Sequence, residues 1–233
     1  MMRLLLERPA FQPLLRRRAL KVVRDPVARA YLEAPLPDIR QPLARASFLA
    51  LDFETTGLNP RTDRILSMGF VPLEEGRIRL GQARHCLVDA GIPLKGESVA
   101  VHHITDAEAR HGCGLKEMMD VLLPAMTGRI LLVHYAAVER RFLHAAMKAL
   151  YGAVLPFHVV DTMELERRRL IRANPHVKPT DLRLAACRAR HGLPPHRPHH
   201  ALEDAIATAE LFLAQYPPTD RALALLPVSR LLS

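Results

Sequence analysis

Apolar residues in this chain form short runs and periodic stretches, and the two patterns predict different elements. Short runs rich in branched and aromatic residues, bounded by charged or turn-forming positions, are typical of buried strands. We expect strands at SFLALDF (47–53), RILSMGFVPL (64–73), RIRLGQARHCLVD (77–89), RILLVH (129–134) and FHVVD (157–161). The Glu74-Glu75-Gly76 turn between the second and third runs predicts an antiparallel hairpin.

Helical periodicity dominates most of the remaining chain. Amphipathic patterns predict helices at 114–126, 136–152, 162–171, 181–192 and 201–216. Three strands followed by alternating helices and strands predict an α/β fold, a mixed sheet of about five strands flanked by helices. In such sheets, binding sites gather where strands end and helices begin.

The first 46 residues differ in composition from the rest. They comprise two basic segments, AFQPLLRRRALKVVRD and PVARAYLEA, which we expect to be helical, and a proline-bearing linker. We therefore predict a basic helical N-terminal extension and linker over 1–46, a compact domain over 47–216 and a peripheral, proline-punctuated tail over 217–233.

Positive charge is in excess and unevenly spread. Lys and Arg number 33 against 24 Asp and Glu, and residues 1–46 supply six of the nine surplus charges, with ten basic against four acidic residues. An acidic polymer is therefore a reasonable partner. The basic residues of RRRALKVVR spread around a helix rather than along one stripe, so a solvated face and a nucleic-acid contact are equally good interpretations. No aromatic series accompanies them as a stacking platform.

The three cysteines, Cys86, Cys113 and Cys187, are odd in number and show no C-x-x-C spacing, which disfavours a disulfide framework and a cysteine zinc site. The opening leucines are too few for a signal-peptide core, and no apolar run approaches the roughly 20 residues that span a bilayer. We expect a cytoplasmic protein with no membrane partner.

Two acidic residues close the first predicted strand. In FLALDFETTGL (48–58), Asp52 and Glu54 are two residues apart and project to one face of an extended chain, while Phe53 points to the other face and into the core. Buried carboxylates are costly unless a cation or donors pair with them, so a metal ion is a candidate. The alternative is an ordinary strand end with its acids in solvent.

A second feature lies far along the chain in HHALEDAIATAELF. His199 precedes Asp204 by five residues, and Asp204 falls in the first turns of a predicted helix beside apolar positions. By itself this acid would more often stabilise the helix N-terminus, and the histidine would more often be an exposed loop residue.

Together, these segments resemble a known family. FLALDFETTGL, VHHITD, LLVHYAAVERRFL, VVDTMEL and HHALEDAIATAEL follow the order and approximate spacing of the DEDDh exonucleases, over roughly residues 47–214. This group of the ribonuclease-H-like superfamily includes the proofreading subunit of bacterial DNA polymerase III, ribonuclease T and oligoribonuclease. The resemblance implies a ribonuclease-H-like sheet and a 3′–5′ exonuclease that releases 5′-monophosphates.

The resemblance also implies roles for individual residues. Asp52, Glu54 and Asp204 would bind two divalent ions, and His199 would be the general base for the attacking water. Two ions can generate the nucleophile and relieve charge on both oxygens of the phosphodiester, and oxygen ligands without thiolate favour Mg²⁺ or Mn²⁺. Because a free imidazole has a pKa of about 6.5, activity should rise through that pH. Substrate contacts at the 3′-terminal nucleotide are implied for Thr55, Thr56, Gly57 and Leu58, which would otherwise form a simple turn.

The second motif departs from the family pattern H-N-x-x-F-D. In HYAAVE, Tyr135 stands at the Asn position, Val138 at the Phe position and Glu139 at the Asp position. Glutamate still offers two oxygens, so we predict that Glu139 is the fourth metal-binding acid. Alternatively, it misplaces the second ion or is a surface residue paired with arginines. Asp161 is a fallback ligand whose position in the family is more often supporting.

Some histidines allow other interpretations. His196, His199 and His200 could suggest zinc, but His199 already has a role in the family pattern, and we expect His200 to be an ordinary intervening residue. For His102 and His103 in VHHITD we expect packing and hydrogen bonding.

Substrate and partners are less determined. We expect a nucleic acid with a free 3′ end, single-stranded DNA first and RNA second, because DNA and RNA enzymes share these motifs. Any proofreading role would require a polymerase partner, and oligomeric state stays open. The competing hypothesis is a weakened nuclease domain that binds nucleic acid or a partner protein.

Overall fold

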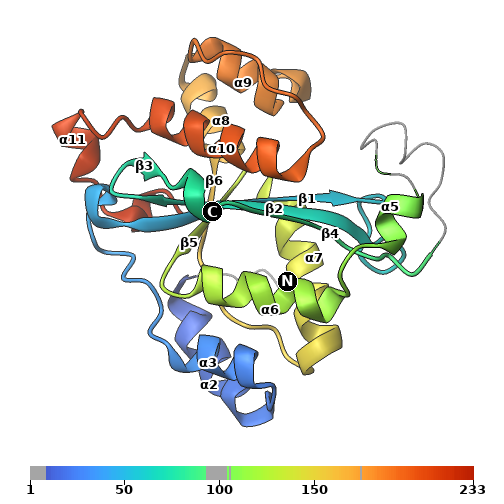
Figure 1. The fold of residues 1–233 in the computed structure, drawn as a ribbon. Helices are drawn as coiled ribbons and strands as arrows, with labels where there is room; N and C mark the ends of the chain where they lie inside the picture. The colour runs from blue at the N-terminus through green and yellow to red at the C-terminus, as the bar shows by residue number, and fades with distance from the viewer. Residues whose placement is uncertain (1–8, 93–103, 105, 174) are drawn as a thin grey trace.

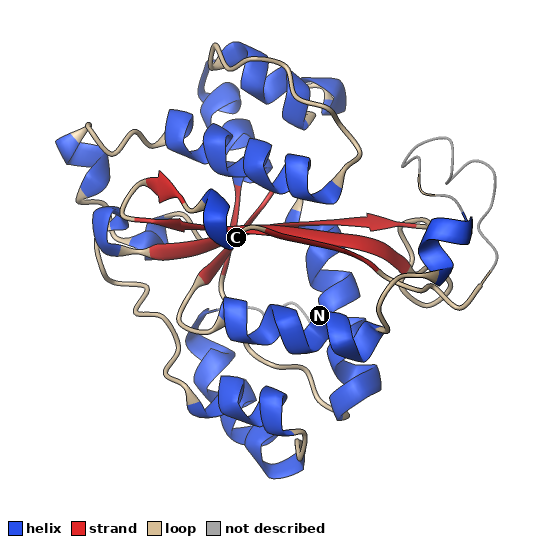
Figure 2. Cartoon of the chain, viewed as in Figure 1, coloured by secondary structure: helices blue, strands red, loops and turns tan. Residues whose placement is uncertain are grey.

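A mixed β-sheet forms the centre of the protein, as a computed structural model shows for residues 9–92, 104, 106–173 and 175–233 (Figures 1 and 2). Within these residues the strand order is β3-β2-β1-β5-β6, and β4 also pairs with β2. The strands are β1 (Ser47–Thr55), β2 (Ile65–Glu74), β3 (Arg77–Ile78), β4 (Arg84–Leu87), β5 (Ile130–Val133) and β6 (Val159–Asp161). Strand β1 is antiparallel to β2 and parallel to β5, so the predicted mixed α/β sheet is confirmed.

The hairpin forms at the predicted turn, but the prediction of one strand over 77–89 is wrong. Strands β3 and β4 both pair with β2, and the 3₁₀ turn η3 (Leu80–Gln82) separates them. The interruption falls beside Val71 and Pro72 of β2, and a proline has no backbone N–H with which to extend a ladder. Glu75 and Gly76 make the turn with φ of 51° and 68°.

Helices cover both faces of the sheet (Figure 1). One layer contains α2 (Gln12–Val22), α3 (Pro26–Glu33), α6 (Leu115–Met126) and α7 (Ala136–Tyr151), and the other contains α8 (Thr162–Ala173), α9 (Leu184–Arg190) and α10 (Ala201–Gln215). The shorter elements are η1 (Pro9–Phe11), η2 (Leu43–Arg45), α5 (Asp106–Arg110), η4 (Pro179–Leu182), α11 (Arg221–Ala224) and η5 (Val228–Arg230).

The alternation along β1 divides the core into two clusters. Leu49, Leu51 and Phe53 belong to the cluster that includes residues of α2, α3, α6 and α7. Phe48 and Ala50 belong to the opposite cluster, beneath α8 and α10. Asp52 and Glu54 continue this second register, so the two acids lie on the α10 face while Phe53 is buried in the core, as predicted.

The N-terminal helices contribute to the core directly. Ala19, Val23, Ala28 and Leu32 are buried in the same cluster as the residues of α6. Their attachment is also polar, because Tyr31 donates a hydrogen bond to the Pro156 carbonyl at 2.7 Å. The basic residues Arg17, Arg18, Lys21 and Arg24 stay exposed.

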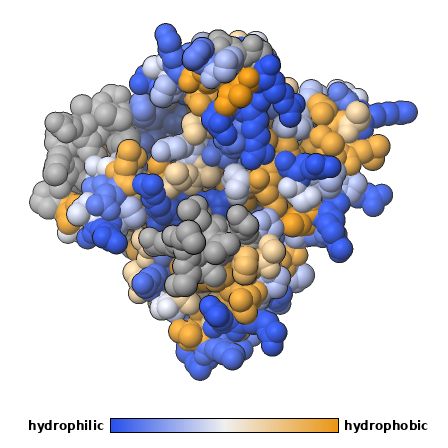
Figure 3. Space-filling model, turned by 180° about the vertical axis from the view of Figure 1, so that it is seen from behind, coloured by the Kyte–Doolittle hydropathy of each residue, from blue (hydrophilic) through white to orange (hydrophobic). Residues whose placement is uncertain are grey.

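The tail is not peripheral, contrary to the sequence-based prediction. Val228 and Leu231 are buried, and the Ser233 N–H donates to the Val159 carbonyl at 3.1 Å. Apolar residues that follow Pro227 therefore cover the β6 side of the sheet, which hydropathy alone did not reveal. Within the described part of the chain, no helix has the length and apolar character needed to span a membrane. On the face seen in Figure 3, hydrophilic and apolar residues are intermixed.

Candidate active site

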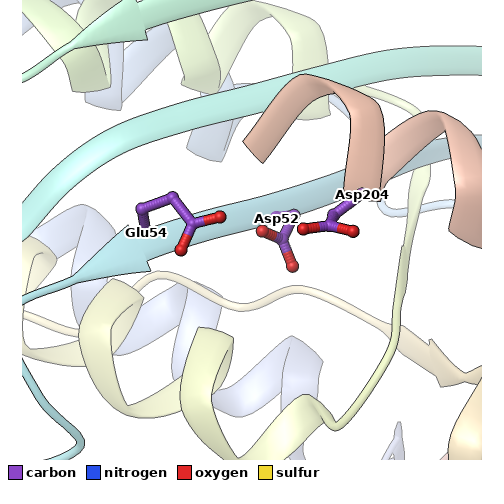
Figure 4. Close-up of side chains that lie close together, drawn as sticks. All are labelled: Asp52, Glu54 and Asp204. Atoms are coloured by element: carbon purple, nitrogen blue, oxygen red, sulfur yellow. The ribbon is translucent and has the colours of Figure 1, made fainter. Parts of the chain in front are cut away.

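Three carboxylates converge where β1 ends and α10 begins (Figure 4). Asp52 and Glu54 project from β1 just before an irregularity between Glu54 and Thr55, and Asp204 projects from the start of α10. One oxygen from each of the three side chains lies within 4.8 Å of the other two. The sequence places these acids about 150 residues apart, and the fold brings them together as the family resemblance implied.

The carboxylates lie close enough for their negative charges to repel one another. Burial raises the pKa of Asp52 well above its ordinary value, and the negative charges of Glu139, Glu54 and Asp204 raise it further. Burial also raises the pKa of Asp204, although His196 opposes the shift. A cation would relieve this repulsion, and the all-oxygen donor set fits a hard divalent ion. These residues therefore fit the metal site that the sequence predicted.

Both oxygens of Asp204 are oriented by the segment that precedes α10. The His199 backbone N–H donates to Oδ2 at 2.8 Å, and His196 Nε2 lies 2.8 Å from Oδ1. His199 adopts a left-handed backbone with φ of 64°, and its exposed side chain borders the acidic pocket. The contact of His196 was missed at the sequence level, because a histidine eight residues before an aspartate carries no periodic signal.

His196, His199 and His200 do not assemble as a zinc site. Among the described residues, the acidic trio is the group whose side chains converge as metal ligands. His200 instead caps α10, where its Nδ1 accepts from the Glu203 N–H at 3.4 Å, and its ring stacks on His85 with centroids 4.4 Å apart. His102 and His103 lie outside the described residues.

Glu139 lies on α7 and lines the same pocket as the three acids. It is 4% exposed, so the interpretation as a surface residue is wrong. Its Oε2 is buried without a hydrogen-bond partner among the described residues, and burial raises the pKa of Glu139 to about 8. Glu139 is not one of the three side chains within mutual ligand distance, so its binding to metal remains a prediction.

The start of α7 is held by Asp161 at the end of β6. The Asp161 carboxylate accepts hydrogen bonds from the backbone N–H groups of Tyr135 at 3.0 Å, Ala136 at 2.9 Å and Met163 at 2.9 Å. Tyr135, with φ of 80°, turns the chain between β5 and α7. Both carboxylate oxygens of Asp161 therefore accept hydrogen bonds from the backbone at the start of α7, the helix that carries Glu139.

The segment after the first acids forms one wall of the pocket. The Thr55 hydroxyl donates to the Gly57 carbonyl at 2.7 Å, and the Thr56 hydroxyl accepts from the Arg64 N–H at 3.0 Å. A side chain at Gly57 would approach the Asp63 carboxylate to 2.5 Å. Leu58 is 63% exposed and borders the pocket of about 230 Å³ that holds the acids.

A larger groove adjoins this pocket on the side of α9. It has a volume of about 720 Å³ and shares Asp52, His199 and Asp204 with the acidic pocket. Its far wall is largely apolar and includes Arg183 and Leu184. The site therefore has room for a ligand much larger than a metal ion.

The Exonuclease family model (ribonuclease T type) matches residues 49–212, which include all four candidate acids and His199. The chain belongs to the exonuclease family. This membership confirms the resemblance seen in the motifs and, at family level, the expected enzyme class, a 3′–5′ exonuclease.

The chain is also similar to curated DNA polymerase III proteins and to a solved nuclease structure. The chain is 30% identical over 168 residues to the DNA polymerase III PolC-type protein of Thermotoga petrophila, covering 72% of this chain and 12% of the relative. It is 32% identical over 179 residues to a DNA polymerase III subunit epsilon-like protein of Rhodobacter capsulatus, covering 76% of this chain and 24% of the relative. The chain thus spans 12% and 24% of the length of these two relatives. The fold resembles that of cell-death related nuclease 4, with a TM-score of 0.63 and 17% sequence identity. The match covers 76% of this chain and 65% of that nuclease chain.

The burial of Glu139 in this exonuclease domain predicts a stability effect. Since the folded pKa of about 8 exceeds the ordinary value of 4.5, the folded state keeps a proton that the unfolded state releases, and stability falls as pH rises between those values. We expect Glu139→Gln to stabilise the metal-free protein by on the order of a few kcal/mol at pH 8, with a smaller gain at pH 5. Urea unfolding in EDTA at both pH values measures this difference. An equal stabilisation at both pH values would contradict the raised pKa of Glu139 in the folded protein.

Proposed function

We propose that the chain is a metal-dependent exonuclease that removes nucleotides one at a time from the 3′ end of a nucleic acid and releases 5′-monophosphates. The observation that carries this proposal is the convergence of Asp52, Glu54 and Asp204 within 4.8 Å, with His199 bordering the same pocket. Membership of the exonuclease family supports the same reaction class.

Each residue then has a role that its position suits. Asp52, Glu54 and Asp204 would hold Mg²⁺ or Mn²⁺, with Glu139 as the fourth acid. Two such ions, when bound, would lower the pKa of water and stabilise the charge on the attacking and leaving oxygens. The His199 imidazole would accept the proton of the attacking water, because its ring is exposed to the pocket while its backbone is fixed to Asp204.

The substrate end would be held beside the acids. Thr55, Thr56, Gly57 and Leu58 line or support the pocket wall and would contact the 3′-terminal nucleotide, with the exposed Leu58 offering an apolar surface to its base. The neighbouring groove near Arg183 would receive a further part of the strand. We favour single-stranded DNA over RNA, because the relatives named above include components of DNA polymerases.

The proposal extends to a protein partner and to the basic N-terminal extension. A polymerase or another protein is a candidate partner, since the relatives are DNA polymerase III proteins many times longer than the matched region. We retain the division into a basic extension over 1–46, an exonuclease domain over 47–216 and a tail over 217–233. The exposed basic side chains of α2 would extend the surface available to nucleic acid.

The end requirement and the products test the proposed reaction. Uniformly labelled linear single-stranded DNA should yield nucleoside 5′-monophosphates from the first time points, separated by thin-layer chromatography. A covalently closed circular strand of the same sequence should resist, because it has no 3′ end. Cleavage of the circle, or oligonucleotides as the first products, would contradict exonuclease action.

The second candidate function is a weakened nuclease domain that binds nucleic acid or a partner protein. The observation that favours it is Glu139 at the position where the family has aspartate, because this acid does not belong to the group of side chains whose ligand atoms all lie within 4.8 Å of one another. In that case the site would keep the geometry of a nuclease site but would hydrolyse very little substrate.

Substitutions at Glu139 separate the two functions. For an active enzyme we expect Glu139→Ala to lower turnover by at least about tenfold and Glu139→Asp to lower it less, because the shorter side chain keeps the charge. Steady-state rates on a labelled strand measure both. A Glu139→Ala variant with unchanged rate, together with a faster Glu139→Asp variant, would instead indicate a degenerated site.

A further inference from the structure

One row of residues crosses the sheet directly beneath the start of α10. In the strand register Asp52 of β1 lies opposite Gly69 of β2, and Gly69 lies opposite His85 of β4. Directly opposed residues of antiparallel strands point to the same face, so this row faces α10. Asp52 and His85 therefore flank a position that has no side chain.

The backbone of α10 occupies the space above Gly69. A Cβ atom built on Gly69 would lie 2.1 Å from the Leu202 nitrogen and 2.3 Å from the Ala201 carbonyl carbon. Both atoms belong to the main chain at the first turn of α10, so no side-chain rotation could make room. At one end of the row His200 stacks on His85, and at the other Asp204 reaches Asp52.

We propose that Gly69, with His85 beside it, positions the first turn of α10 so that Asp204 lies within ligand distance of the β1 acids and His199 borders the same pocket. This inference rests on the proposed function for its catalytic meaning, but its geometric content is independent of substrate. Gly69 would then be a positioning residue, since it touches none of the reacting groups itself.

The displacement that a side chain at position 69 would force is large compared with what a metal site tolerates. Real Cβ atoms essentially never approach another heavy atom to less than 3.0 Å, so alanine at 69 would require the Leu202 nitrogen to retreat by at least 0.9 Å, the difference between 3.0 and 2.1 Å. Metal–ligand distances tolerate only about 0.2 Å. Strand β2 cannot yield instead, because it is paired on both sides and buried over nearly its whole length. The shift would fall on α10 and on Asp204.

Mn²⁺ binding to the full chain without substrate, measured by electron paramagnetic resonance, tests the proposal. We expect Gly69→Ala to weaken Mn²⁺ affinity by roughly 10- to 100-fold. The matched control is Gly81→Ala, because Gly81 has an ordinary φ and no atom within 4 Å of its added Cβ, and it should bind like the wild type. Gly69→Ala with wild-type affinity would overturn the proposal.

A double variant separates positioning from general destabilisation. If Gly69→Ala acts by withdrawing Asp204, then adding Asp204→Asn should cost little further Mn²⁺ affinity, whereas Asp204→Asn alone costs much. Fully additive losses would overturn the proposal. Should Gly69→Ala lack a cooperative melt, His85→Ala decides, because removing the ring beneath His200 should weaken Mn²⁺ binding several-fold, and unchanged affinity would overturn the idea.

Failure of this inference differs from failure of the proposed function. A wild-type protein that binds Mn²⁺ but degrades no strand would remove the proposed function and leave the role of Gly69 testable by affinity. If the wild type is an active nuclease and its Gly69→Ala variant binds Mn²⁺ with normal affinity, the positioning role of Gly69 fails and the proposed function stands.

Discussion

Asp52→Asn is expected to reduce nuclease activity to background while the protein remains folded and, without metal, becomes more stable. Burial raises the pKa of the Asp52 carboxyl well above its ordinary value, and the negative charges of Glu139, Glu54 and Asp204 raise it further. Asparagine removes a negative ligand and also removes that repulsion. The two changes have opposite signs for activity and for stability, as buried catalytic charges often do.

The measurement pairs a rate with a melting temperature. The rate of strand shortening in Mg²⁺ should be lost in Asp52→Asn, and equally in Glu54→Gln and Asp204→Asn, while the melting temperature of Asp52→Asn in EDTA should rise. Glu75→Gln is the matched control, since Glu75 lies in the β2–β3 turn with its side chain 80% exposed. Full activity in any one of the three acid variants would overturn the site.

Replacement of His199 should lower turnover by about 10²- to 10⁴-fold, the usual contribution of a general base, and leave the affinity for a 3′ end nearly unchanged. The reason is geometric. The contact of His199 with Asp204 runs through its backbone N–H, so a substitution removes the imidazole but keeps this hydrogen bond.

The choice of substituent matters because His199 has φ of 64°. Alanine is strained in this region, whereas asparagine adopts it readily, so His199→Asn isolates the chemistry from the backbone cost. Single-turnover rates and equilibrium binding of a labelled strand should be compared for both variants, with His111→Ala as a control at an exposed histidine that lines neither the acidic pocket nor its groove. Equal losses of binding and turnover would contradict a general-base role.

Local patterns predicted the elements of this site well. Period-two alternation in β1 correctly put Asp52 and Glu54 on one face and Phe53 in the core, and helical periodicity correctly put Asp204 in the first turns of α10. Their meeting could not follow from spacing, since they are far apart in sequence, and it rested on the resemblance of ordered motifs to a family.

The features that sequence reasoning missed are tertiary contacts. Gly69 has no local signal in a strand of apolar residues, and its role depends on a helix that begins more than 130 residues later. His196 reaches Asp204 only because the chain turns at His199. The buried tail and the split of β3 from β4 likewise depend on partners that a linear pattern does not name.

The most direct test of the central claim uses 5′-labelled single-stranded DNA and RNA of one sequence, incubated with the wild-type chain or Asp52→Asn in Mg²⁺, in Mn²⁺ or in EDTA. We predict a ladder that shortens from the 3′ end, requires metal, is absent in the variant and is faster on DNA. Tight binding of both strands with no shortening in either metal, or the same ladder from Asp52→Asn, would contradict a metal-dependent exonuclease centred on these carboxylates.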